Sequence, residues 1–149
     1  KLEKGPDNFI EIIKNLDYEN KNLKVVLTGK RRNYIINKLN ELKISFEYFQ
    51  MVDNKRLNEL YNSLDLYIVA SRVEGGPQSI LECALSKTPI ISTDVGVANQ
   101  ILSDKSIFTM KEYRNAKPNV EHAYTEASKF EMNKVFLLYN KMLQNLYEN

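Results

Sequence analysis

The chain has 149 residues, of which 43% are hydrophobic and 27% are charged, as in an ordinary globular domain. Its net charge of +2 is too small to indicate nucleic acid or an anionic membrane surface as the partner. The single cysteine, Cys83, excludes an internal disulfide and fits a reducing compartment. With His122 as the only histidine, the protein also lacks the ligands for a zinc site. The length suits one domain with a sizeable core.

Helix and strand patterns alternate along most of the chain. Pro6 opens a helix with an apolar face, and a β-branched strand at 24–28 ends at Gly29. Further strands are predicted at 46–49, 66–70, 89–93 and 106–109, and helices at 34–42, 55–64 and 97–102. This order predicts an α/β fold, a Rossmann-like three-layer domain with a mostly parallel sheet.

Three cations, Lys30, Arg31 and Arg32, stand where the helix at 34–42 begins. A positive charge at a helix start opposes the helix dipole. The three residues therefore indicate either a nearby anion or a solvated basic turn.

Residues 120–147 carry apolar side chains at helical spacing. A break near Phe130 predicts two segments, and the last helix covers about 131–147. Its apolar face could belong to the core or to a dimer interface.

The stretch 70–82 contains the clearest sign of a binding site. It follows the buried strand at 66–70, turns on Gly75 and Gly76, and enters a helix at Pro77, whose fixed φ suits a first helical position. The free N–H groups of such a helix start, together with its dipole, attract phosphate. The stretch thus predicts a site for a phosphate-bearing ligand at the turn.

Two carboxylates, Glu74 and Glu82, flank this helix start with seven residues between them. A carboxylate does not bind phosphate, but it accepts hydrogen bonds from hydroxyl groups such as those of a sugar. The spacing resembles the Glu-x7-Glu signature of retaining GT-B glycosyltransferases of glycosyltransferase family 4, also called group 1.

The resemblance extends beyond the two glutamates. Lys4 and Gly5 resemble the Lys-Gly opening of the family's nucleotide-sugar domain, and 23–29 resembles its second strand. Residues 89–96 resemble the strand and glycine turn that follow the signature, so the match runs from about 4 to about 102 and, more loosely, over the last helix. The chain departs from the family at Val97 and Gln100, where a second glycine and an acidic residue are usual.

The resemblance implies a role for each residue of the site. Lys4, helped by Arg72, would stabilise negative charge on the leaving diphosphate. Glu74 would contact hydroxyls of the transferred sugar, and Glu82 would accept both ribose hydroxyls. The remaining donor-binding residues that it implies are Gly75, Gly76, Gln78, Ser79 and Ile80 at the diphosphate, with Met51 and Val52 in a loop behind the nucleotide base. Met51 could otherwise be a core side chain.

The implied function of residues 1–149 is donor binding in an enzyme that moves a sugar from a nucleotide-diphosphate sugar to a glycan or lipid-linked acceptor. No metal or other cofactor is implied, because Lys4 and helix N–H groups take the place of a cation. The chain begins without methionine inside a family motif, so we expect it to be the carboxy-terminal half of a larger enzyme. It would bind nucleotide without transferring sugar alone, and its last helix would cross to the amino-terminal domain.

Two other functions stay open. One is a non-catalytic nucleotide-sugar-binding domain, which the changes at Val97 and Gln100 favour. The other is a GT-B-shaped epimerase or phosphorylase, which the Glu-x7-Glu spacing and the Lys-Gly opening disfavour. The chain has neither an apolar stretch near twenty residues nor a signal-peptide pattern, so we expect a cytoplasmic location, with any membrane contact made through the other domain.

Overall fold

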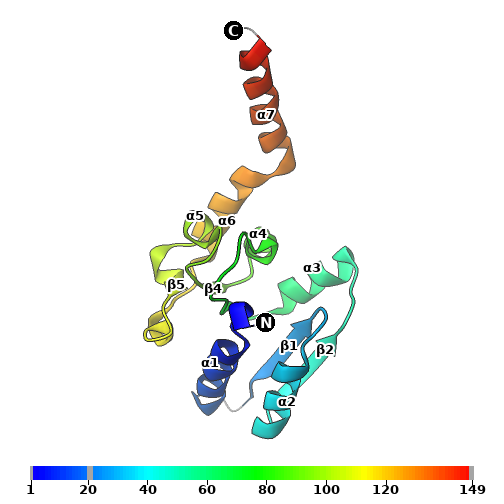
Figure 1. Ribbon diagram of the computed structural model, residues 1–149, viewed down its shortest axis with the longest axis vertical. Helices are drawn as coiled ribbons and strands as arrows, with labels where there is room; N and C mark the ends of the chain where they lie inside the picture. The colour runs from blue at the N-terminus through cyan, green and yellow to red at the C-terminus, as the bar shows by residue number, and fades with distance from the viewer. Residues whose placement is uncertain (1, 20–21, 148–149) are drawn as a thin grey trace.

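Short parallel strands separated by helices make up the body of the molecule (Figure 1). The computed structural model describes residues 2–19 and 22–147. In chain order the elements are η1 (Leu2–Lys4), α1 (Pro6–Glu19), β1 (Lys24–Thr28), α2 (Asn33–Leu42), β2 (Ser45–Phe49), α3 (Asn54–Ser63), β3 (Tyr67–Val69), α4 (Gln78–Leu85), β4 (Ile90–Thr93), α5 (Ala98–Ile101), η2 (Asp104–Ser106), β5 (Ile107–Phe108), η3 (Tyr113–Asn115), α6 (Val120–Ala127), η4 (Ser128–Phe130) and α7 (Met132–Tyr147).

The strands form two parallel sheets. β1 pairs with β2, with Val25 opposite Phe46, and the second sheet has the order β3–β4–β5, with Ile68 opposite Ile91. Each parallel pair is joined by a crossover that contains a helix, which confirms the predicted α/β class and the parallel strands. The single sheet expected from the sequence is divided: in the described part of the chain β1 and β3 do not pair with each other, and both line a cavity.

Helix α1 packs against both sheets (Figure 1). Ile10 and Ile13 join the apolar cluster of β1, β2 and α2, whereas Ile12 joins the cluster of β4, β5 and η3. A third cluster lies under α4, α5 and α6 and includes the fully buried Ile80 and Ile101. The amphipathic pattern of α1 thus fixes the two sheets relative to each other.

The start of α4 differs by one residue from the prediction. Pro77 was expected at the first helical position, but its ψ of 105° is extended, so the helix begins at Gln78 and Pro77 is the residue before it. The carbonyl of Pro77 still accepts the N–H of Ile80, at 3.0 Å.

Helix α7 extends away from the body of the molecule (Figure 1). The predicted break near Phe130 is confirmed, since η4 separates α6 from α7. The exposed apolar side chains of this segment are Phe130, Val135, Phe136, Leu137, Leu138, Tyr139 and Met142. The prediction that this face belongs to the core is therefore wrong. Exposed apolar side chains are expected on a helix face that packs against a different surface, such as another domain or a second copy of the chain. None of the described helices is both long and apolar enough to cross a membrane.

Candidate functional site

Two glycine turns meet at the start of α4. Gly96, after β4, has a φ of +54°, which L side chains rarely adopt. A Cβ atom at Gly96 would lie 2.7 Å from Cδ of Pro77 and 2.9 Å from Cα of Gly76. Only glycine fits at this approach, so the turn after β4 supports the turn from which α4 begins.

The N-terminal segment closes against the end of β3. Gly5 also has a φ of +54°, and a Cβ atom there would lie 1.9 Å from the carbonyl oxygen of Ala70. The backbone N–H groups of Arg72 and Val73 both donate to the carbonyl of Glu3, at 2.7 and 3.2 Å. These contacts explain why the Lys-Gly opening needs its glycine: the backbone must pass directly over the strand end.

Arg72 holds the same segment through its side chain. Its guanidinium donates two hydrogen bonds to the carboxylate of Asp7, at 2.7 and 2.5 Å, and one to the side-chain oxygen of Asn8, at 3.0 Å. The hydrogen bonds from Arg72 lower the pKa of Asp7 to about 2. The sequence had suggested Arg72 as a diphosphate ligand; the structure places it on the start of α1, and a contact with diphosphate stays a prediction.

Lys4 and Glu74, both predicted to be catalytic, lie together although they are far apart in sequence. Nζ of Lys4 donates to Oε1 of Glu74 at 2.5 Å, and the hydroxyl of Ser71 donates to the same oxygen at 3.1 Å. The Lys4 side chain is 56% exposed and that of Glu74 only 16%. Oε2 of Glu74 has no hydrogen-bond partner among residues 2–19 and 22–147, so it can accept a hydrogen bond from a ligand hydroxyl.

The start of α4 supplies the predicted N–H donors in part. Gln78 and Ser79 are the first residues of the helix, so their N–H groups have no acceptor within it. The N–H of Ile80 is already bonded to Pro77, and the Ile80 side chain is buried. The space around Gly75 and Gly76 is open, because a Cβ atom on either residue would have no neighbour within 4 Å.

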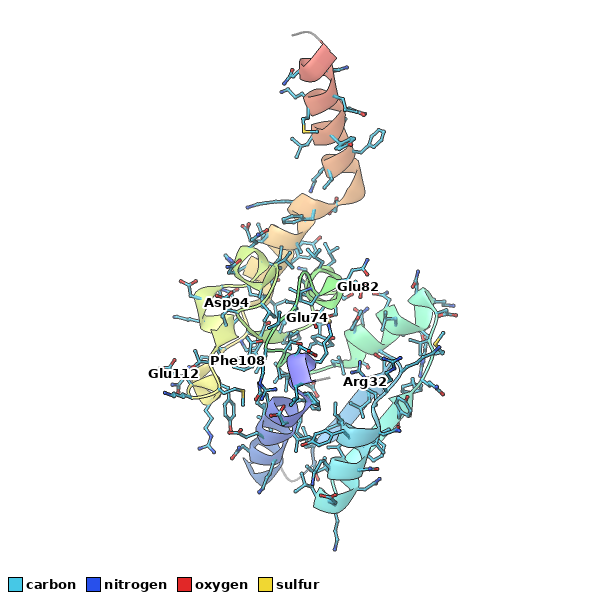
Figure 2. The ribbon with its side chains drawn as sticks, viewed as in Figure 1. Arg32, Glu74, Glu82, Asp94, Phe108 and Glu112 are labelled. Carbon is cyan, nitrogen blue, oxygen red and sulfur yellow. The ribbon has the colours of Figure 1, made fainter. Side chains whose placement is uncertain are left out.

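Glu82 lies on the side of α4 that faces α3, while Glu74 lies beside the N-terminal segment (Figure 2). The hydroxyl of Tyr61, on α3, donates to Oε2 of Glu82 at 2.9 Å. Tyr61 lies in the helix that the sequence predicts at 55–64, but no pattern in the sequence indicates the acidic partner of its hydroxyl.

A cavity of about 1220 Å³ lies between the two sheets. From the predicted site it is lined by Lys4, Glu74 and Ser79, and from the basic turn by Lys30, Arg31 and Arg32. The other predicted site residues, including Glu82, do not line the cavity. Tyr61, whose hydroxyl donates a hydrogen bond to Glu82, does line it.

The loop after β2 is solvent-exposed. Met51 is 75% exposed, so a core position is wrong for it, and Val52 is half-buried. Contact of this loop with a nucleotide base stays a prediction.

The described residues contain no group of three or more His, Cys, Asp or Glu side chains that could hold a metal ion. His122 is exposed on α6. Cys83 is fully buried in α4, where it packs in the core, and burial raises the pKa of its thiol.

The chain belongs to the family of group 1 glycosyl transferases, whose model matches residues 1–145. It is 36% identical, over 75 residues, to the GtfA subunit of UDP-N-acetylglucosamine–peptide N-acetylglucosaminyltransferase from Streptococcus parasanguinis. That match covers 48% of this chain and 14% of that protein. The predicted family relationship is thereby confirmed.

Solved structures share the fold at low sequence identity. The chain aligns over its whole length with 35% of a chain of the GtfA/B complex, with a TM-score of 0.75 and 16% identity. The pneumococcal O-GlcNAc transferase GtfA, solved with UDP and GlcNAc, aligns with a TM-score of 0.67 and 18% identity over 100% of this chain and 34% of its own. The catalytic domain of cholesterol-α-glucosyltransferase from Helicobacter pylori gives a TM-score of 0.62 and 20% identity over 99% of this chain and 88% of its own. The chain thus spans about a third of the GtfA structures and has the fold of a GT-B domain.

Proposed function

We propose that the chain is the donor-binding domain of a retaining glycosyltransferase that uses a nucleotide-diphosphate sugar. The observation that carries this proposal is the pairing of Lys4 with Glu74, 2.5 Å apart, on a cavity that Ser79 at the start of α4 also lines. A cation, a half-buried carboxylate and free N–H donors are the groups that a sugar diphosphate requires.

In this proposal the donor replaces the ion pair between Lys4 and Glu74. Lys4 turns to the diphosphate, where the N–H groups of Gln78 and Ser79 also donate, and Glu74 accepts hydroxyls of the sugar. During transfer the bond between the anomeric carbon and the diphosphate oxygen breaks, and the diphosphate keeps the electron pair. The acceptor hydroxyl bonds to the carbon and passes its proton to an oxygen of the leaving diphosphate. Lys4 and the N–H groups stabilise the charge that develops on the leaving group.

Glu82 is proposed to bind the ribose, so the two glutamates do not form the acid and nucleophile pair of a glycosidase. Retention of configuration is part of the proposal because the two residues have the spacing found in retaining members of the family. Binding without a metal is also part of it, since Lys4 and the helix N–H groups supply the positive charge.

The donor to test first is UDP-N-acetylglucosamine, because the relatives named GtfA are described with this sugar nucleotide or with UDP and GlcNAc. The acceptor is proposed to be a glycan or a lipid-linked acceptor molecule. The exposed apolar side chains of α7 support a second part of the proposal, namely that this helix packs against an amino-terminal domain of a longer protein.

A thermal-shift series with UDP, GDP, ADP and CDP tests the proposal. A ligand at a hundred times its dissociation constant adds about 2.7 kcal/mol of stability, which raises the melting temperature by roughly 5–10 °C for a chain of this size. We expect one nucleotide to give this shift, with EDTA present or absent, and Glu82→Ala to abolish it. Glu11→Ala, which removes an exposed carboxylate on α1, is the matched control and should keep the shift. The proposal fails if no nucleotide stabilises the chain or if Glu82→Ala responds like the control.

A further inference from the structure

The hydroxyl of Tyr61 has one well-defined position in the structure. Tyr61 is only 8% exposed, and its ring meets that of Tyr67 edge-on, with centroids 5.8 Å apart and an interplanar angle of 87°. The Thr88 hydroxyl donates to the backbone carbonyl of Tyr61 at 2.9 Å. Both the ring and the backbone of Tyr61 are therefore held by contacts with neighbouring residues.

The hydroxyl donates to Oε2 of Glu82 at 2.9 Å. In the described part of the chain this is the one hydrogen bond to the Glu82 carboxylate, and no cation lies within ion-pair distance of it. Oε1 and the second lone pair of Oε2 thus stay available as acceptors. Burial raises the pKa of Tyr61, so its hydroxyl keeps its proton and continues to donate over the neutral pH range.

A glutamate side chain on a helix surface normally samples several rotamers, and fixing one of them on binding weakens affinity. Tyr61 fixes the Glu82 carboxylate in advance, at the cost of one of its four acceptor positions. A planar carboxylate with unfilled acceptor positions on both oxygens matches two neighbouring hydroxyl groups, and a ribose offers these at its 2′ and 3′ positions.

We infer that Tyr61 is a positioning residue that orients Glu82 toward both ribose hydroxyls and so sets a preference for ribonucleotides over 2′-deoxyribonucleotides. The inference rests on the proposed function, because it requires that Glu82 binds ribose. The inference adds to the site a residue of α3, whereas Glu82 lies on α4. It also predicts a selectivity that can be measured.

The test compares the dissociation constants of UDP and 2′-deoxy-UDP, measured by calorimetry on the 149-residue chain, or of the matching pair if another base proves to bind. We expect the wild type to prefer the ribonucleotide. Tyr61→Phe, which keeps the ring but removes the hydroxyl, should weaken binding of the ribonucleotide by up to about tenfold, because the Glu82 side chain must then be ordered on binding. Binding of the deoxy form should change less, so the ratio of the two constants falls toward one.

Tyr113→Phe is the matched control. Tyr113 is also a buried tyrosine, at 9% exposure, and its hydroxyl accepts a hydrogen bond from Asn15 at 2.6 Å, away from the cavity. This variant should lose a similar amount of stability but keep the ribose selectivity. In addition, the double variant Tyr61→Phe/Glu82→Gln should show hardly more loss of selectivity than Glu82→Gln alone, because both changes act on one interaction.

The outcomes separate the inference from the proposed function. If the wild type binds no nucleoside diphosphate, the proposed function fails and the inference falls with it. If the wild type binds and Glu82→Ala abolishes binding, but Tyr61→Phe only lowers the melting temperature and leaves the selectivity unchanged, then Tyr61 is a core residue and the inference alone is wrong.

Discussion

Replacing Gly5 by alanine should destabilise the protein strongly, although the residue is small and lies in a turn near the N-terminus. Its φ of +54° lies in the left-handed region, which costs an L residue about 1–2 kcal/mol. The new Cβ atom would stand 1.9 Å from the carbonyl oxygen of Ala70, so the segment around Gly5 must move away from β3.

That movement breaks further contacts. The carbonyl of Glu3 accepts hydrogen bonds from the N–H groups of Arg72 and Val73, and each such bond contributes about 1 kcal/mol. We therefore expect Gly5→Ala to lower the free energy of unfolding by about 2–4 kcal/mol. The same movement draws Lys4 away from Glu74, so nucleotide binding should weaken as well.

The measurement is urea unfolding at 25 °C, in which a loss of this size moves the midpoint by about 1–2 M if the slope is unchanged. Gly75→Ala is the control, because a Cβ atom there meets nothing within 4 Å and the φ of Gly75 lies outside the left-handed region. Its stability should change by less than about 1 kcal/mol in either direction. If the two variants unfold at the same urea concentration, the close approach of Gly5 to β3 is not a constraint on the fold.

Three further predictions concern acid stability, thiol reactivity and packing. The pKa of Asp7 is lowered to about 2 by Arg72, so the pair stabilises the fold fully above about pH 4 and loses this effect as the pH falls toward 2. Both side chains are more than a third exposed, so Asp7→Asn should cost less than about 1 kcal/mol at pH 7, and the difference from the wild type should shrink below about pH 4 and vanish only below pH 2 in pH-dependent urea unfolding. Cys83 is fully buried and burial raises the pKa of its thiol, so a thiol reagent at pH 8 should label it only when urea unfolds the protein. Leu39→Ala, in the β1–β2 cluster, should cost about 2–5 kcal/mol, whereas Leu137→Ala, on the exposed surface of α7, should change stability by less than about 0.5 kcal/mol.

Each of these predictions has a result that would contradict it. Asp104→Asn, at an exposed aspartate with no ion pair among the described residues, should not alter the pH dependence of stability. If both aspartate variants show the same pH dependence, the Arg72–Asp7 pair does not stabilise the fold. Rapid labelling of Cys83 without urea would show that α4 opens readily in the native state. A large loss of stability in Leu137→Ala would mean that α7 packs against a surface in solution.

Much of the fold could be predicted from local sequence patterns. Hydrophobic periodicity reports which face of an element is apolar, and this suffices for α1, for the parallel strands and for the break between α6 and α7. The glycines and Pro77 indicated the turn before α4, although the helix start shifted by one residue because Pro77 adopts an extended ψ. The division of the strands into two sheets could not be predicted, since the pattern of β3 is equally apolar whether it pairs with a strand or lines a cavity.

For the site, the sequence by itself determined which groups are present: two carboxylates with seven residues between them, a helix start with free N–H groups, and a lysine before a glycine. The tertiary structure alone decided the partner of each group. It paired Lys4 with Glu74, turned Arg72 to Asp7 instead of toward the cavity, and brought the Tyr61 hydroxyl to Glu82. The physical reason is that a polar side chain finds its partner through chain closure over tens of residues, and neither helical nor strand periodicity carries information about contacts at that distance.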